Sequence, residues 1–190
     1  MVALLKQSDG SPEELVKKKQ FAMYNFEILA EYHLSQELLV EHSNDFLELF
    51  TTTLQENDIQ VKVAALRAIS SFLSSIDDGE VVMKYQQMMG GLLDVVIEVM
   101  KQDETQGQAS LDSLIELTTA HGDIWSGNVS KLIFVTAEVV KNREFEDATR
   151  QSALEIVGTI AENLAAMLRK NVEDLQNYLF PALAFMMTEI

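Results

Sequence analysis

The sequence predicts an all-α fold, an α–α superhelix in which antiparallel helix pairs stack in order. Glycine and proline are scarce, with 8 and 2 among 190 residues, so the chain lacks the turns of a β-rich fold. Apolar residues recur at helical spacing in about eight segments, and no stretch alternates as a strand would. Four of these segments also repeat one pattern at a nearly constant interval, which is typical of stacked repeats.

The predicted helices follow from this spacing. Ser11 is expected to cap the first long helix, and Glu14 completes a capping box three residues later. Met1–Gln7 is typical of the tail of an earlier helix. We expect a bend or break at Gly90–Gly91, and we expect Gly122 to cap the C-terminus of the fifth helix. The predicted helices span residues 11–33, 36–55, 59–75, 81–102, 104–121, 128–141, 146–170 and 172–190.

The repeat is marked by a small side chain at the same position of every second helix. Ala22, Ala65, Ser110 and Ala153 recur at intervals of 43, 45 and 43 residues. Large apolar residues follow one, four and seven positions later in each copy, so these positions share one helix face. Two helices in a period of 43–45 residues match a HEAT repeat. We predict a single HEAT-repeat array over residues 1–190, with units 36–78, 81–122 and 127–170 and partial units 1–34 and 172–190.

Composition and charge limit the kinds of partner that the chain is expected to bind. The formal charge is −16, from 14 basic and 30 acidic residues. A surface of this sign repels phosphates, so we expect no direct binding of nucleic acid. It favours encounter with a basic partner, although a need for solubility alone also explains it. No run of about 18 apolar residues is present, so we expect no membrane insertion.

Residue types that carry catalysis or bind metals form no recognisable motif. His33, His42 and His121 show no metal-ligand spacing, and the chain has no cysteine to join them. No Walker-type glycine loop, GxSxG turn or HExxH motif is present. We therefore predict no catalytic residue, no cofactor and no metal, and a protein that is not an enzyme. An enzyme with an unrecognised site stays an alternative, which a deep pocket with converging ionisable groups would favour.

Residues 149–190 contain the most specific motifs. They read Arg150-Gln151-x-Ala153-Leu154-Glu155-Ile156, then AAMLRK at 165–170, and then a helix with Pro181 and Met186-Met187. Together with the repeat pattern over residues 58–121, these motifs resemble the HEAT-repeat nuclear transport receptors of the importin-β or karyopherin-β family. Within that family the sequence is most similar to the karyopherin β-3 branch, which includes the importin five proteins.

This resemblance implies a receptor that shuttles between cytoplasm and nucleus through the nuclear pore. Such a receptor carries cargo proteins with basic localisation signals and releases them when Ran-GTP binds. In the family the first helix of each repeat lies on the convex side and binds Phe-Gly segments of nucleoporins. The second helix lines the concave side, which meets cargo and Ran. Because neither end of the chain has a polar capping repeat, we expect an inner fragment of a longer array.

Acidic residues on the second helices are the candidate cargo-binding site. Their spacings of three to four residues make them neighbours along a helix face, where they could bind Lys or Arg of a localisation signal. A solvated helix face is the alternative reading of the same residues. The candidates are Glu27, Glu31, Asp112, Glu116, Glu155 and Glu162.

Apolar residues on the first helices are the candidate nucleoporin-binding site. A groove between adjacent helices could accept a phenylalanine ring, which has a large apolar area for its size. Ordinary core packing is the alternative for each of these residues. The candidates are Phe46, Phe50, Met88, Met89, Leu92, Phe134 and Leu179.

A second functional class stays open. Other HEAT arrays are scaffolds without catalysis, such as subunits of phosphatases or of chromosome-organising complexes. Binding of Phe-Gly peptides separates the two classes, because a scaffold is not expected to bind them.

Overall fold

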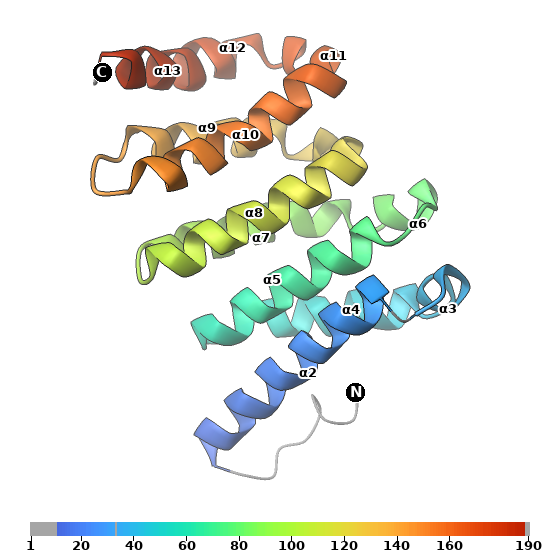
Figure 1. Ribbon diagram of the computed structural model, residues 1–190. Helices are drawn as coiled ribbons and strands as arrows, with labels where there is room; N and C mark the ends of the chain where they lie inside the picture. The colour runs from blue at the N-terminus through green and yellow to red at the C-terminus, as the bar shows by residue number, and fades with distance from the viewer. Residues whose placement is uncertain (1–10, 33, 189–190) are drawn as a thin grey trace. The chain divides into compact units, whose positions relative to one another are not determined.

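The structure is a computed structural model that describes residues 11–32 and 34–188. These residues fold into helices joined by short connections, without a strand, which confirms the all-α prediction (Figure 1). The chain divides into two compact units, one ending at Tyr85 and the other beginning at Gln86. The helix tail predicted at Met1–Gln7 lies outside the described residues.

The first unit contains two long helices, α2 and α5, with α3 and α4 between them and the short helix α6 after them. The predicted capping box is confirmed, because Ser11 N–H donates to Glu14 Oε2 at 3.0 Å and Glu14 N–H donates to Ser11 Oγ at 3.3 Å. Helix α2 packs along α5, and α4 packs against α5. The helices of this unit are α2 (Pro12–Tyr32), α3 (Gln36–Glu41), α4 (Ser43–Leu54), α5 (Ile59–Ser74) and α6 (Gly79–Met83).

Aromatic side chains fill the core of the first unit. The rings of Phe26, Phe46, Phe50, Phe72 and Tyr85 lie between 4.9 and 6.5 Å from their neighbours, in four tilted pairs and four pairs that are edge to face. The edge-to-face geometry is a favoured one for aromatic pairs, and it adds to the burial of apolar area. The core therefore joins α2, α4 and α5 with the residue that ends the unit.

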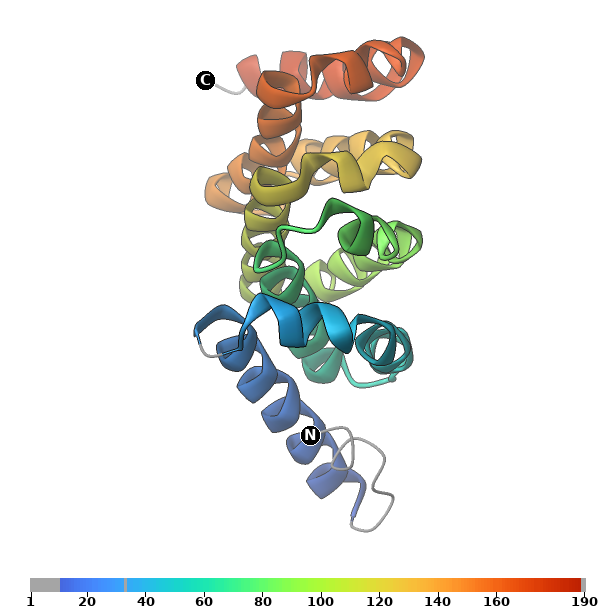
Figure 2. The same ribbon diagram turned by 90° about the vertical axis from the view of Figure 1, so that its right-hand side faces the viewer.

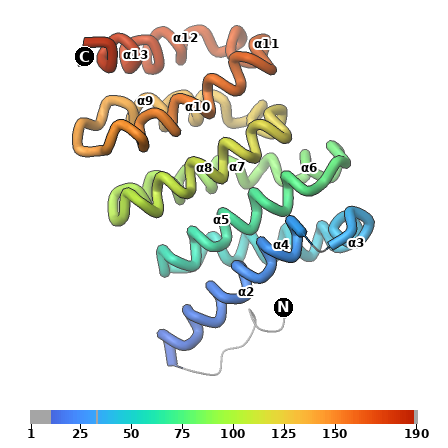
Figure 3. Tube along the Cα trace, in the orientation of Figure 1, coloured from blue at the N-terminus to red at the C-terminus, as the bar shows by residue number. Residues whose placement is uncertain are grey.

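The second unit has two layers of helices, which Figure 2 shows from the side. Helices α8 and α10 pack on one another in one layer, while α9 packs on α7 and on the C-terminal helix in the other. The chain path in Figure 3 alternates between the layers. The elements are η1 (Gln86–Met88), α7 (Met89–Met100), α8 (Glu104–His121), η2 (Gly122–Gly127), α9 (Val129–Lys141), α10 (Asp147–Asn163), α11 (Ala165–Arg169), α12 (Val172–Asp174), η3 (Leu175–Leu179) and α13 (Phe180–Met187).

Hydrogen bonds between successive copies confirm the repeat within each unit. Ser71 Oγ donates to the Glu27 carbonyl in the first unit, across 44 residues. In the second unit Ser152 Oγ donates to Asp112 Oδ1 across 40 residues, and Asn128 Nδ2 donates to the Gln86 carbonyl across 42. The small residues that mark the period are all buried, as close packing of neighbouring helices requires.

Several predicted helices are broken at other places than expected. The helix predicted over 36–55 is interrupted at His42, and the one over 146–170 ends at Asn163 because Leu164 leaves the helical region with φ −135° and ψ 42°. The fourth helix breaks between α6 and α7 rather than at Gly90–Gly91, which lies inside α7. Gly122 is the C-terminal cap of α8, as predicted, although its φ of −56° is not the left-handed conformation that glycine often adopts there.

Proline explains a widened turn near the end of the chain. Pro181 has no N–H to donate, and its ring would clash with the carbonyl of Asn177 in a regular α-helix. The five residues that precede α13, Leu175–Leu179, adopt a π-helical turn. This wider turn lets the chain pass the proline without ending the helix, and it redirects the side chains that it carries.

Candidate binding surfaces

The acidic residues of the second unit form a face shared by α8 and α10. Asp112 and Glu116 are exposed on α8, and Glu155 and Glu162 are exposed on α10. The two helices pack together, and Ser152 Oγ ties α10 to Asp112 Oδ1 at 3.0 Å. Each pair is spaced by four or seven residues, so its members point to the same side of their helix.

This face has no neutralising cation on its own helices. Helix α8 contains no Lys or Arg, and the only one on α10 is Arg150. Arg150 is buried, with 6% of its surface exposed, and its Nε donates to the Val140 carbonyl at 2.8 Å. The exposed carboxylates therefore present a negative potential that a Lys or Arg side chain of a partner can neutralise.

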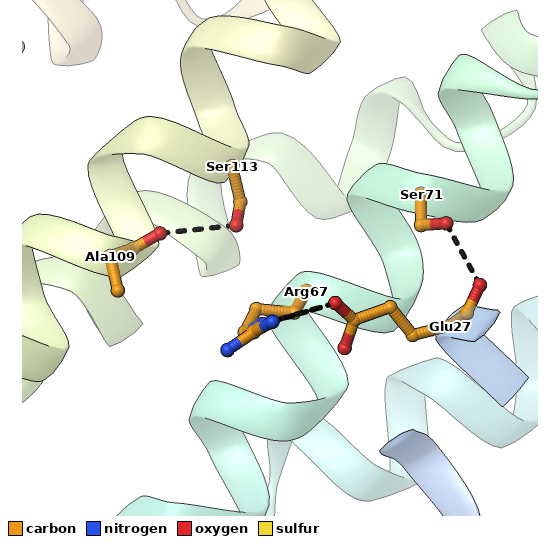
Figure 4. Close-up of polar contacts among 5 residues, drawn as sticks. All are labelled: Glu27, Arg67, Ser71, Ala109 and Ser113. Carbon is orange, nitrogen blue, oxygen red and sulfur yellow. Dashed lines mark hydrogen bonds and ion pairs between the residues drawn. The ribbon is translucent and has the colours of Figure 1, made fainter. Parts of the chain in front are cut away.

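In the first unit, one of the acidic candidates is already paired with a cation. Arg67 of α5 donates from Nη2 to Glu27 Oε1 at 2.8 Å and from Nε at 3.2 Å. Figure 4 shows this pair together with Ser71, whose hydroxyl reaches the carbonyl of Glu27. Glu27 is mostly covered, so its expected role in binding a cation is not supported, because Arg67 already occupies its carboxylate. Glu31 is exposed on α2.

Most of the apolar candidates lie in the core. A buried side chain cannot contact a partner in this conformation. The buried candidates are therefore explained by ordinary core packing. Phe46 is half-buried within the aromatic cluster of the first unit. Phe134 of α9 is the exception, with 41% of its surface exposed. The buried candidates are Phe50, Met88, Met89, Leu92 and Leu179.

Phe134 lines an open groove between α7 and α9. The groove has a volume of about 590 Å³, and apolar side chains contribute most of its surface. Lys101, Lys141 and Glu138 add charged groups to its lining. Its apolar lining residues are Ile97, Met100, Phe134, Val135, Val139 and Phe145.

An ion pair holds the two helices together beyond the groove. Lys131 Nζ of α9 donates to the Gly90 carbonyl at 2.8 Å and to Asp94 Oδ2 at 2.7 Å, both on α7. Gly90 leaves room beside it for the side chain of Asn128, because a Cβ there would come within 2.9 Å of Asn128 Oδ1. The helices are thus fixed at their N-terminal halves, and the groove opens toward their C-terminal ends.

Sequence reasoning missed most of the groove lining. Ile97 and Phe134 occupy ordinary apolar positions of amphipathic helices, where the sequence does not distinguish a groove wall from the core. Phe145 lies in the connection between α9 and α10, whose path the helical pattern does not predict. Only the distance between α7 and α9 leaves these side chains accessible.

Within residues 11–32 and 34–188, no cluster of His, Asp and Glu is placed to hold a metal ion. The helices of the same part of the chain lack the combination of length and apolarity that crossing a bilayer requires.

Comparison with known proteins identifies the family. A family model described as "IPO5-like, TPR repeats" matches residues 2–135, and one described as "Importin repeat" matches residues 142–190. The chain belongs to the importin-5-like branch of the importin-β family. Its intervals of 43–45 residues are closer to HEAT repeats than to the 34-residue period of TPR repeats, and both are helical hairpins.

Curated relatives of this importin-family chain are much longer than it is. It is 21% identical over 173 residues to the "Probable importin-5 homolog" of Dictyostelium discoideum and 27% identical over 151 residues to "Importin subunit beta-3" of Saccharomyces cerevisiae. The matches cover 90% and 77% of this chain but 16% and 13% of the relatives.

Solved structures share the fold over the whole chain. The crystal structure of Kap121p bound to Nup53p matches with a TM-score of 0.77 at 23% identity, covering 100% of this chain and 17% of that one. Kap121p bound to Pho4p matches with a TM-score of 0.74 at 24% identity, over 97% of this chain and 19% of that one. These matches confirm the predicted HEAT-repeat solenoid fold.

Proposed function

We propose that this chain is a segment of a nuclear import receptor that acts by binding proteins rather than by chemistry. In this proposal the groove between α7 and α9 receives Phe-Gly segments of nucleoporins. The acidic face of α8 and α10 receives basic cargo, and Ran-GTP releases that cargo. The receptor would shuttle between cytoplasm and nucleus. The observation that carries the proposal is an open apolar groove between two first helices, in a chain of the importin-β family.

The size and lining of the groove support a phenylalanine as its ligand. A volume of about 590 Å³ is ample for one aromatic ring, and Phe134 offers a partly exposed ring for an edge-to-face contact. Burying one phenylalanine contributes about 1.5–3 kcal/mol, which by itself corresponds to weaker than millimolar binding. A weak single contact suits a receptor that must leave each nucleoporin quickly, and several grooves along an array would add through multivalency.

The cargo part of the proposal is supported by charge. The exposed carboxylates of α8 and α10 have no exposed Lys or Arg on their own helices, because Arg150 of α10 is buried, so a basic localisation signal would supply the missing charge. The solved relatives named above hold other proteins, Nup53p and Pho4p, which supports a protein-binding role for the fold. Release by Ran-GTP rests on the family alone.

Peptide binding to the purified full chain tests the nucleoporin part. A peptide with two Phe-Gly pairs should bind, while the same peptide with Ser in place of Phe should not. Phe134→Asp should remove most of the binding, since it places a charge in the apolar groove. Phe21→Asp is the matched control, because Phe21 is also exposed but lies on α2 of the other unit.

Two results would reject this assignment. If the wild-type chain did not bind the Phe-Gly peptide, the scaffold alternative would be favoured over a transport receptor. If Phe21→Asp weakened binding as much as Phe134→Asp, the groove between α7 and α9 would not be the site.

A further inference from the structure

Phe134, which lines the groove, also contacts a second aromatic ring. Phe134 of α9 meets Tyr178 of η3 edge to face, with ring centroids 5.4 Å apart and an interplanar angle of 90°. The same Phe134 side chain lines the groove between α7 and α9. Tyr178 is absent from the groove lining, and its ring contact with Phe134 connects it to the groove.

The π-helical turn determines where Tyr178 lies. Tyr178 is the fourth of the five residues Leu175–Leu179 that form this turn, directly before the helix that contains Pro181. A π turn contains one more residue than an α turn, so every side chain after its start is rotated relative to a regular helix. We attribute the π-helical turn to Pro181. This turn orients the ring of Tyr178 toward Phe134 of α9.

From these contacts we propose that Tyr178 is a positioning residue that holds Phe134 in the rotamer which shapes the groove. Phe134 is 41% exposed, so the surrounding protein encloses its ring only in part. Without the ring of Tyr178, Phe134 gains other rotamers, some of which fill the groove or leave its wall open. The inference rests on the proposed function for the identity of the ligand, but the positioning of Phe134 can be measured without any ligand.

The test compares Tyr178→Leu with Tyr178→Phe in the full chain. The phenylalanine variant keeps the ring and loses only the hydroxyl, so it should bind the Phe-Gly peptide as the wild type does. The leucine variant keeps apolar volume but loses the edge-to-face contact, so it should bind about three- to tenfold more weakly, as expected for the loss of one aromatic pair. Equal affinity of the two variants would overturn the proposal.

A second measurement separates this inference from the proposed ligand. Fluorine NMR of 4-fluorophenylalanine at position 134, without peptide, should give one sharp line in the wild type and in Tyr178→Phe. The line should shift and broaden in Tyr178→Leu. Loss of the neighbouring ring shifts the line by itself, so it is a line that stays sharp in Tyr178→Leu that would contradict the positioning role, whatever the peptide does.

The two measurements together distinguish the possible failures. If the fluorine line broadens in Tyr178→Leu but the wild-type chain does not bind the Phe-Gly peptide, the positioning of Phe134 is upheld and the proposed ligand is rejected. The unfolding midpoint of each variant is measured alongside. A Tyr178→Leu chain that fails to fold is replaced by Tyr178→Met, for which the same outcomes apply.

Discussion

Tyr85 shows how one residue combines packing with hydrogen bonding. Its ring contacts Phe50 and Phe72, and its hydroxyl donates to the carbonyl of Ser43. The side chain has no exposed surface. Burial disfavours the phenolate and therefore raises the pKa of Tyr85 well above its usual value.

A loss of stability at alkaline pH is the expected consequence. The unfolded chain loses the Tyr85 proton near pH 10, whereas the folded chain retains it, so ionisation favours the unfolded state. The contribution of Tyr85 should be complete below about pH 10 and fall by about 1.4 kcal/mol per pH unit above it. Urea unfolding of the wild type and of Tyr85→Phe at several pH values measures this, because the variant removes the proton and keeps the ring.

The difference between the two proteins isolates the effect from lysines that also titrate near this pH. If the stability difference between wild type and Tyr85→Phe stayed constant from pH 8 to 11, the phenol would not titrate differently in the two states. The raised pKa would then be wrong.

At the scale of elements, close packing between consecutive helices depends on one glycine. A Cβ on Gly107 of α8 would lie 2.4 Å from Cγ and 3.0 Å from Cα of Met100 at the end of α7. The second of these atoms is backbone, which cannot move aside as the end of a side chain can. The absence of a side chain at Gly107 therefore allows α8 to begin directly against α7.

Two alanine substitutions with opposite expected signs test this contact. Gly107→Ala should lower the free energy of unfolding by about 1–3 kcal/mol, the usual cost of overpacking. Gly158→Ala is the matched control in α10, where a Cβ would meet nothing within 4 Å and the residue is exposed. It should raise stability by about 0.5–1 kcal/mol through better helix propensity. Chemical denaturation measures both, and a stabilising Gly107→Ala would disprove the close approach.

Elements also show why some boundaries could be predicted and others not. The capping box at Ser11 and Glu14 and the bounds 104–121 follow from local chemistry and were predicted. The breaks at His42 and Leu164 were not, because neither residue is a glycine or proline that would signal one. Contacts with neighbouring helices decide such positions.

At the scale of the whole molecule, charge is the dominant property, but its distribution matters more than its sum. The net charge of −16 attracts any basic partner at long range. The acidic face of α8 and α10 contains no exposed cation, whereas α5 has Lys62 and Arg67 and no acidic residue. A specific cargo site on α8 and α10 and a non-specific attraction by the net charge therefore predict different effects of charge reversal.

Charge reversals at two places separate a cargo site from a general field. Replacing Asp112, Glu116 and Glu155 with Lys should abolish binding of a lysine-rich peptide, because it removes the proposed ligands of that peptide. The control replaces three other exposed glutamates, Glu37, Glu41 and Glu48, which changes the net charge by the same amount. Calorimetric titration at about 0.15 M salt, where the Debye length is about 8 Å, suppresses the long-range part. Equal losses in both variants would mean that α8 and α10 hold no specific site.

By itself the sequence determined the fold class, the repeat period and the family. Periodic burial is a local property, because each hairpin must place small and large residues at the same positions to pack on the next copy. The sequence also placed the acidic residues of α8 and α10 on exposed helix faces, since charged side chains are rarely buried without a partner.

Only the tertiary structure decided which of the candidates are accessible. Phe134 and Phe50 are both apolar positions on first helices, yet one lines a groove and the other lies in the core. Glu27 and Glu155 are both acidic positions on second helices, yet Glu27 forms an ion pair with Arg67 whereas Glu155 is exposed. Accessibility and pairing depend on how far neighbouring helices stand apart and on which side chains reach across, and these distances are set by packing between elements that are remote in sequence.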